Sequence, residues 1–126
     1  MSTKTIIKPK NSPSPVGPYN HAVRVGDLLF CSGQIPLDPS GTLVTGDIRA
    51  QTERVLENVK AILDDQGLTL ANVVKSTVFL TNLGDFTAMN EVYARYFTSD
   101  FPARSTVQVA ALPRGASVEI EVVAHY

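Results

Sequence analysis

Near the C-terminal end of the chain, an arginine and a glutamate have the types and the spacing of a small polar site. Arg104 follows Phe-Pro-Ala in the stretch Phe101–Val123, and Glu119 alternates with aliphatic residues later in the same stretch. This pattern is typical of two β-strands joined by a turn at residues 113–115. A guanidinium is a fork of hydrogen-bond donors for an anion, and a carboxylate can exchange a proton with a reacting group. The two residue types therefore indicate a polar site on a sheet.

Both residues also fit a simpler interpretation. Glutamates that alternate with aliphatic residues usually form the wet face of a half-buried strand, and an arginine at a strand start is usually solvated. Arg104 would then be a surface residue, and Glu119 and Glu121 would face water. The pattern alone leaves the two interpretations open.

Four positions elsewhere are candidates for a site or for the core. Tyr19 ends a proline-rich loop at residues 9–18 and presents its hydroxyl to a site or packs on the loop. Asn90 lies near the apolar stripe of a predicted helix, where it needs partners from a loop or from a site. Gly33 inside a strand pattern marks a bulge or a close approach of the backbone. Cys31 is expected in the core, because no positive neighbour lowers its pKa.

The composition is that of one soluble globular domain over residues 1–126, with 44% hydrophobic and 18% charged residues. The net charge of −1 gives no electrostatic case for nucleic acid or an anionic membrane as a partner. A single cysteine suits a reducing compartment, and no apolar run approaches the ~20 residues of a membrane span. Prolines in the basic N-terminal segment oppose the helix of a transit peptide, so we expect a cytoplasmic protein.

The hydrophobic periodicity predicts the element order β-β-β-α-β-α-β-β. The first four strands are expected at residues 3–7, 21–25, 28–32 and 73–80. Two amphipathic helices are expected, one from its N-cap Asp47 to Gly67 and one from its N-cap Asp85 to about Phe97. This order predicts an α+β domain with one mixed sheet and two helices packed on it.

The predicted sheet has apolar residues on both faces, including Phe79 and Val123, although the two helices can cover only one. A monomer would leave a large apolar patch exposed, which soluble proteins rarely tolerate. The pattern therefore predicts a homo-oligomer in which other copies cover the second face.

Several short stretches, spread over nearly the whole chain, form an ordered set of motifs. They are Gly17-Pro18-Tyr19, Ser32-Gly33-Gln34-Ile35-Pro36, Asn58-Val59-Lys60, Val74–Leu80, Phe86-x-x-x-Asn90-x-x-Tyr93, Phe101-Pro102-Ala103-Arg104-Ser105, Val109-Ala110-x-Leu112-Pro113 and Glu119-Ile120-Glu121. With these motifs the chain resembles the reactive-intermediate deaminase A family, the Rid or YjgF-type enamine/imine deaminases. The Ser-Gly-Gln and Pro-Ala-Arg-Ser pieces together are the most specific.

The resemblance implies a fold, an assembly and a reaction. The fold is a chorismate-mutase-like α+β subunit, and three subunits form a trimer with a central sheet barrel and sites between subunits. The reaction is hydrolysis of 2-iminopropanoate and 2-iminobutanoate, or their enamine tautomers, to 2-oxo acids and ammonia. Pyridoxal-phosphate-dependent dehydratases acting on serine and threonine release these substrates. The enzyme would be a 2-iminobutanoate/2-iminopropanoate deaminase.

The resemblance also implies roles for Arg104 and Glu119. Arg104 holds the substrate carboxylate through a bidentate pair of charge-assisted hydrogen bonds. Glu119 positions the attacking water and relays a proton to the leaving nitrogen. An imine is already electrophilic, so neither a metal nor another cofactor is expected, and the sequence has only His21, His125 and Cys31 as further candidate ligands.

Five further residues are expected around the substrate by the same resemblance. Ser32 and the backbone of Gly33 complete the cradle, and Tyr19 and Asn90 close it. Thr106 stands where many relatives carry a cysteine, so thiol chemistry tied to that position does not carry over to this chain.

Alternative functions remain open at this point. Relatives have been described as ribonucleases that inhibit translation, as stress chaperones and as small-ligand sensors. A non-enzymatic binder of 2-oxo acids would use the same Arg104, but such a binder gains nothing from the carboxylate of Glu119 beside an anionic ligand. The preferred imine and the dehydratase that supplies it are not indicated by the sequence.

Overall fold

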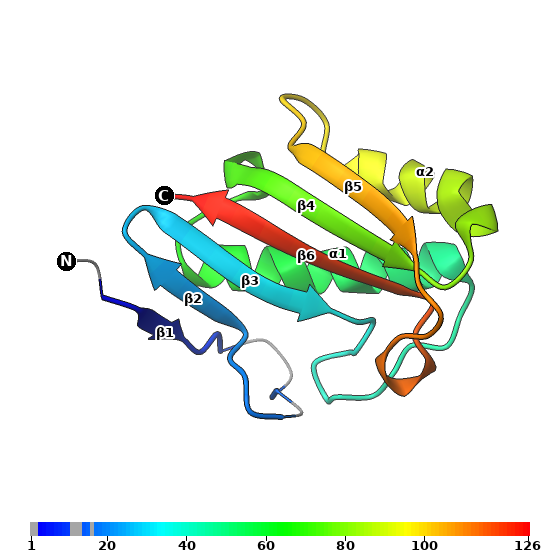
Figure 1. The fold of residues 1–126 in the computed structure, drawn as a ribbon, viewed down its shortest axis with the longest axis horizontal. Coiled ribbons are helices and arrows are strands. Elements are labelled where there is room, and N and C mark those ends of the chain that lie inside the picture. The colour runs from blue at the N-terminus through cyan, green and yellow to red at the C-terminus, as the bar shows by residue number, and fades with distance from the viewer. Residues whose placement is uncertain (1–2, 11–13, 16) are drawn as a thin grey trace.

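Six strands form one sheet in the order β1-β2-β3-β6-β4-β5 (Figure 1). The computed structural model describes residues 3–10, 14–15 and 17–126, so part of the predicted loop at residues 9–18 lies outside the described residues. The elements are β1 (Thr5–Ile7), β2 (Ala22–Val25), β3 (Leu28–Gln34), α1 (Ile48–Asp65), β4 (Val73–Leu80), α2 (Phe86–Tyr96), β5 (Ala103–Gln108) and β6 (Val118–His125). Of these described strands, only β4 and β5 pair in parallel. The predicted mixed sheet and element order are confirmed.

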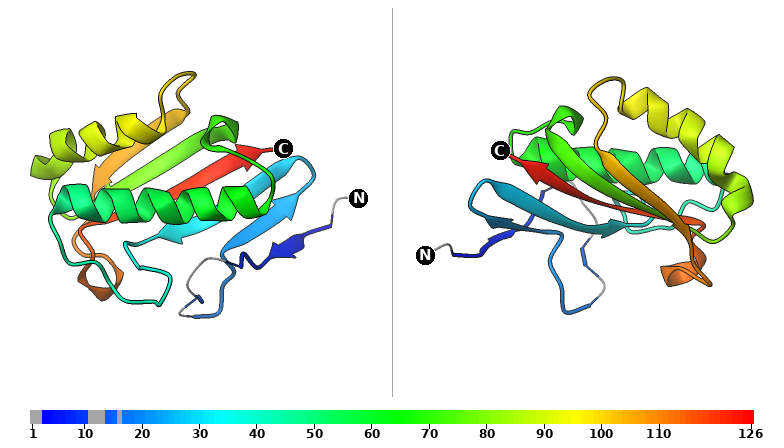
Figure 2. Two further views of the ribbon diagram at one scale, coloured as in Figure 1. Left: turned by 180° about the vertical axis from the view of Figure 1, so that it is seen from behind. Right: turned by 45° about the horizontal axis from the view of Figure 1, so that its top comes forward.

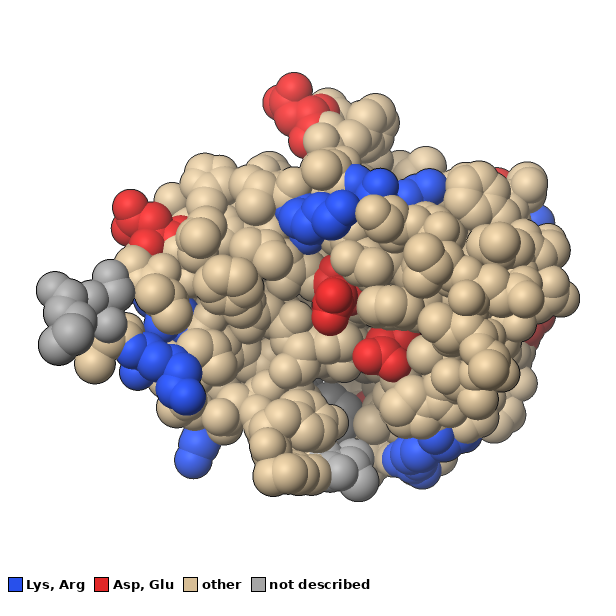
Figure 3. All heavy atoms as spheres, in the orientation of Figure 1, with Lys and Arg blue, Asp and Glu red and all other residues tan. Residues whose placement is uncertain are grey.

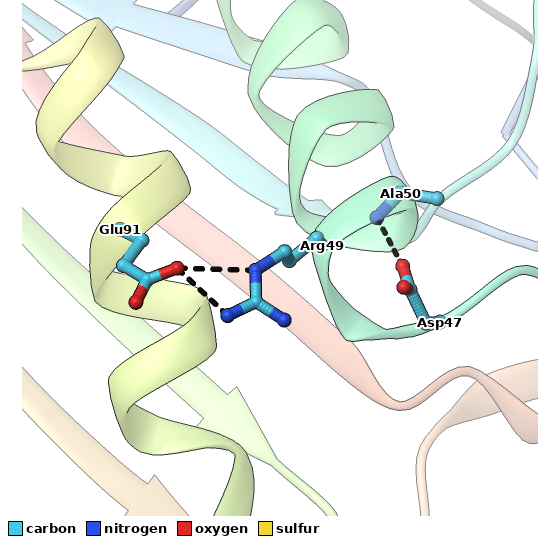
Figure 4. Close-up of polar contacts among 4 residues, drawn as sticks. All are labelled: Asp47, Arg49, Ala50 and Glu91. Carbon is cyan, nitrogen blue, oxygen red and sulfur yellow. Dashed lines mark hydrogen bonds and ion pairs between the residues drawn. The ribbon is translucent and has the colours of Figure 1, made fainter.

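The helices α1 and α2 lie side by side on one face of the sheet (Figure 2). Asp47 caps α1 as predicted, because its Oδ1 accepts a hydrogen bond from the backbone N–H of Ala50 at 2.9 Å (Figure 4). Arg49 of α1 and Glu91 of α2 form an ion pair at 2.7 Å that joins the two helices. Both side chains are about half exposed, so solvent screens this pair and it contributes little to the free energy of unfolding.

The predicted cap of α2 by Asp85 is wrong. The side chain of Asp85 makes no capping hydrogen bond, and its backbone lies at φ −85° and ψ 2° instead of the extended region that an N-cap needs. A short 3₁₀ turn at Leu83–Asp85 precedes the helix, and Asn82 caps that turn by accepting the N–H of Gly84 at 2.8 Å. The capping signal therefore lies three residues before the expected position.

The core fills the space between the two helices and the sheet. Its largest fully buried side chains are Leu29, Leu56, Ile62, Leu63, Leu80, Met89 and Ile120. Cys31 belongs to this core, as predicted, and burial raises the pKa of its thiol to about 12. The thiol is therefore protonated and unreactive at neutral pH.

In the described part of the chain, no helix lies on the other face of the sheet, which is called the open face below (Figures 1 and 2). Leu28, Phe30 and Val107 are each about 40% exposed there, and Phe79 and Val123 are half-buried. Acidic atoms occupy its centre, over β6 (Figure 3). The prediction of apolar residues on both faces is thus confirmed. Among the described residues, neither helix has the length and hydropathy needed to cross a membrane.

Candidate active site

The strands that carry Arg104 and Glu119 both border β4, and they are not neighbours of each other. Arg104 pairs with Ser76 of β4, whereas Glu119 pairs with Phe79 of the same strand. Side chains three residues apart on a strand point to opposite faces. Ser76 is hydrogen-bonded to Tyr93 of α2, so Arg104 lies on the helix-covered face and Glu119 on the open face. One chain therefore does not bring the two side chains together.

The first group of site residues surrounds the guanidinium of Arg104. Its Nη1 donates a hydrogen bond to Oδ1 of Asn90 at 2.8 Å. Its Cζ lies 4.7 Å from the ring centre of Tyr93 and 5.6 Å from that of Phe86. These contacts place Arg104 and Asn90 at a cavity of about 270 Å³, beside the strongly exposed Phe101. A guanidinium carries five N–H donors, so hydrogen-bonding capacity remains for an anion at this cavity.

Thr106 lies two residues after Arg104 on the same face of β5, paired with the buried Val78. Its Oγ1 is buried and has no hydrogen-bond partner among the described residues. A hydroxyl both donates and accepts, so this atom keeps unused hydrogen-bonding capacity. Asn90, for which the sequence allowed a bond to a loop or a role in a site, contacts the site arginine.

The second group surrounds Glu119, at a cavity of about 420 Å³. Tyr19, Ser32 and Gly33 line this cavity with Glu119, as expected of one site. The pairing of β3 with β6 shifts register between Cys31 and Gln34, so Gly33 lies in a bulge. A Cβ at Gly33 would collide with the carboxylate of Glu119. The prediction of a bulge and a close approach at Gly33 is confirmed.

Hydrogen bonds fix the segment before β2 against this cavity. The Oγ of Ser32 donates to the carbonyl of Asn20 at 2.5 Å, and its backbone N–H donates to the carbonyl of His21 at 2.8 Å. Tyr19 directly precedes Asn20 and is about half exposed at the rim of the cavity. The segment from Tyr19 to His21 is thus held beside Glu119 by Ser32.

Burial raises the pKa of Glu119, and the like charge of Glu121 on the same face raises it further. A glutamate with a raised pKa exchanges a proton more readily near neutral pH than an ordinary one. Glu121 is exposed and lines a different hollow of the open face. No group of three or more His, Cys, Asp or Glu side chains is arranged as a metal site in the part of the chain that the structure describes.

The sequence did not assign two residues to these cavities. Tyr93 was named only as part of a motif, yet it lines the cavity of Arg104, and its spacing of three from Asn90 was the available signal. Arg114 was expected only in a turn, yet it lines the cavity of Glu119. Its φ of 58° is in the left-handed region, and its Nη1 donates to the carbonyl of Gly41 at 2.9 Å. Neither the left-handed turn nor this contact across the chain could be predicted from local pattern.

Comparisons with known proteins cover nearly the whole chain. A profile of the family described as Endoribonuclease L-PSP matches residues 9–126. The human protein named 2-iminobutanoate/2-iminopropanoate deaminase is 45% identical over 122 residues, which cover 96% of this chain and 89% of the human one. The structure of YyfA from Yersinia pestis, described as a conserved Rid-family protein, has a TM-score of 0.95 at 48% identity, covering 98% and 100% of the two chains. The structure of E. coli TdcF with bound serine has a TM-score of 0.91 at 42% identity, covering 97% and 98%.

Proposed function

The chain belongs to the Endoribonuclease L-PSP family, which includes the Rid and YjgF proteins, and we propose that it hydrolyses small 2-imino acids to 2-oxo acids and ammonia. The observation that carries this proposal is the pair of half-sites. One presents a guanidinium held by Asn90, and the other presents a half-buried carboxylate, Glu119, with a raised pKa. The activity named for the human relative and the serine bound to TdcF support a small ligand that carries a carboxylate.

The proposed reaction uses both half-sites. Arg104 binds the carboxylate of the 2-imino acid and so fixes the position of the imine carbon. Glu119 accepts a proton from a water molecule whose oxygen forms a bond to that carbon, and the C=N bond becomes a single bond. The proton passes to the nitrogen, which gives a carbinolamine. Glu119 then transfers the proton of the new hydroxyl group to the nitrogen, the C–N bond breaks, and ammonia leaves as the C=O bond of the 2-oxo acid forms.

The site also requires a second copy of the chain. Arg104 and Glu119 lie on opposite faces of one sheet, so a complete site joins the Arg104 side of one chain to the open face of another. The same contact would cover Phe30 and Val107, whose exposure is unusual for a monomer. We expect a homotrimer with a site at each subunit boundary, and light scattering should give about three times the chain mass of 13.6 kDa. A stable monomer at micromolar concentration would contradict this assembly.

A second candidate function is non-catalytic binding of 2-oxo acids, which the geometry of Arg104 favours equally. Such a protein would bind the reaction product and leave the rate of imine hydrolysis unchanged. The description of the family as an endoribonuclease adds a third outcome, which an RNA-cleavage assay on the same preparation tests.

The deciding experiment follows imine hydrolysis in a coupled reaction. Purified protein is added to a threonine dehydratase reaction with semicarbazide, which traps 2-iminobutanoate as a semicarbazone. A deaminase lowers the semicarbazone signal, and Arg104→Ala should abolish that effect because the carboxylate loses its partner. An unchanged signal with the wild-type protein would refute the proposed activity, and full activity in Arg104→Ala would remove Arg104 from the mechanism.

A further inference from the structure

The guanidinium of Arg104 is held by one stripe of α2. Phe86, Asn90 and Tyr93 follow one another at helical spacing, and all three contact it. Asn90 takes one N–H of Nη1, and Tyr93 is the nearer of the two rings, at 4.7 Å from Cζ against 5.6 Å for Phe86. Tyr93 therefore forms the aromatic support under the arginine.

Tyr93 is itself fixed from two sides. Its hydroxyl is hydrogen-bonded to Oγ of Ser76 at 2.7 Å, and Ser76 is fully buried. Its ring stacks on Phe97 with 4.4 Å between ring centres and 25° between planes. Tyr93 is only 6% exposed, so the ring cannot turn without breaking these contacts. Ser76 also pairs with Arg104 in the sheet, so the ring of Tyr93 and the backbone of Arg104 are both held by Ser76.

A fixed ring matters to an arginine that binds a carboxylate. Bidentate binding needs the planar fork of the guanidinium in one orientation, and stacking on an aromatic face restricts that plane. The hydrogen bond to Asn90 fixes one edge of the fork but does not by itself fix the tilt of its plane. The ring of Tyr93 supplies the missing restraint.

We propose that Tyr93, anchored by Ser76, is a positioning residue that holds the guanidinium of Arg104 in the plane that binds the carboxylate of the ligand. The identity of that ligand, a small 2-imino or 2-oxo acid, rests on the proposed function. The positioning itself depends only on the geometry around Arg104. Tyr93 acts on binding of the carboxylate and has no part in the proton transfer.

The test compares Tyr93→Leu with Tyr96→Leu, a matched change on the same helix. Tyr96 also loses a ring and a 2.7 Å hydrogen bond, from its hydroxyl to Oε2 of Glu57, but it does not line the cavity of Arg104. Calorimetry gives Kd for 2-oxobutanoate, and imine hydrolysis gives KM and kcat. We expect Tyr93→Leu to raise both Kd and KM by about tenfold, with kcat within about twofold of wild type. Tyr96→Leu should leave all three within about twofold.

Two further variants separate positioning from a structural role. Tyr93→Phe keeps the ring and loses the hydroxyl, with its bond to Ser76 and its interaction with Arg104, so its Kd should fall between those of wild type and Tyr93→Leu. In an Arg104→Lys background there is no planar fork, so the loss caused by either change at Tyr93 should shrink to less than about threefold. Should Tyr93→Leu not fold, the same comparison is made with Tyr93→Phe.

Three results would overturn the inference: unchanged Kd in the folded Tyr93 variants, an equal loss in the Arg104→Lys background, or a fall in kcat with KM unchanged. Absence of 2-oxobutanoate binding by the wild-type protein would also contradict it. Kd is measured without turnover. A wild-type protein that binds 2-oxobutanoate but does not hydrolyse the imine would therefore refute the proposed function and still allow the test of Tyr93.

Discussion

Two inactive variants should restore activity when they assemble together. Arg104→Ala removes the proposed carboxylate-binding group, and Glu119→Gln removes the proposed proton carrier, so each homogeneous protein should be inactive. The two positions face opposite sides of one sheet, because Arg104 pairs with Ser76 and Glu119 with Phe79 of β4. A complete site must then take its arginine from one chain and its glutamate from another.

The expected recovery follows from the statistics of mixing. In an equal mixture, a site is intact when its arginine comes from a Glu119→Gln chain and its glutamate from an Arg104→Ala chain. Each condition holds for half of the chains, so about one quarter of the sites are intact. The two variants are unfolded and refolded together, subunit mixing is verified by mass spectrometry, and imine hydrolysis is measured per site.

The control replaces Glu119→Gln with the double variant that carries both changes. No combination of its chains with Arg104→Ala can form an intact site, so the control mixture should remain inactive. Mixed oligomers that contain both single variants and yet show no activity would refute the assignment of the two half-sites to different chains.

Three other changes test single contacts. Arg104→Lys should lower kcat/KM by at least about tenfold in steady-state kinetics, because an ammonium cannot reproduce the planar fork, and wild-type kinetics would contradict this. Gly33→Ala should lower kcat by about 100-fold while 2-oxobutanoate still binds, because the new Cβ displaces the carboxylate of Glu119; an unchanged kcat would show that its position is not critical. Folding raises the pKa of Glu119. Between the ordinary and the raised pKa, the folded protein therefore binds more protons than the unfolded chain, so the free energy of unfolding falls as the pH rises. Glu119→Gln should therefore melt at a higher temperature than wild type at pH 7, and the difference should vanish below the ordinary glutamate pKa of ~4.3; a difference that does not change with pH would exclude this cause.

Local pattern was sufficient for the elements and for part of the site. Alternation of Glu119 and Glu121 with Val118 and Ile120 correctly separated the two faces of β6, and Gly33 was correctly predicted at a bulge. Both predictions depend on the two-residue period of a strand and on the missing side chain of glycine. They require no knowledge of which strands are neighbours.

The relation between Arg104 and Glu119 could not be predicted in this way. Their strands follow each other in the sequence, but β4 lies between them in the sheet, and its register decides that the two side chains face apart. Strand order and register depend on packing between distant segments. The same holds for Asp85, where a short turn capped by Asn82 replaced the expected cap, and for the contact of Tyr93 with Ser76.

The most direct test of the central claim is a paired measurement on Glu119→Gln. Gln keeps the size of the side chain and removes its charge and its capacity to carry a proton. The account predicts that imine hydrolysis falls by about 10²–10⁴-fold while the affinity for 2-oxobutanoate persists or increases, since Arg104 still binds the carboxylate. Unchanged hydrolysis in the Gln variant would contradict the account, because Glu119 would then have no part in the reaction.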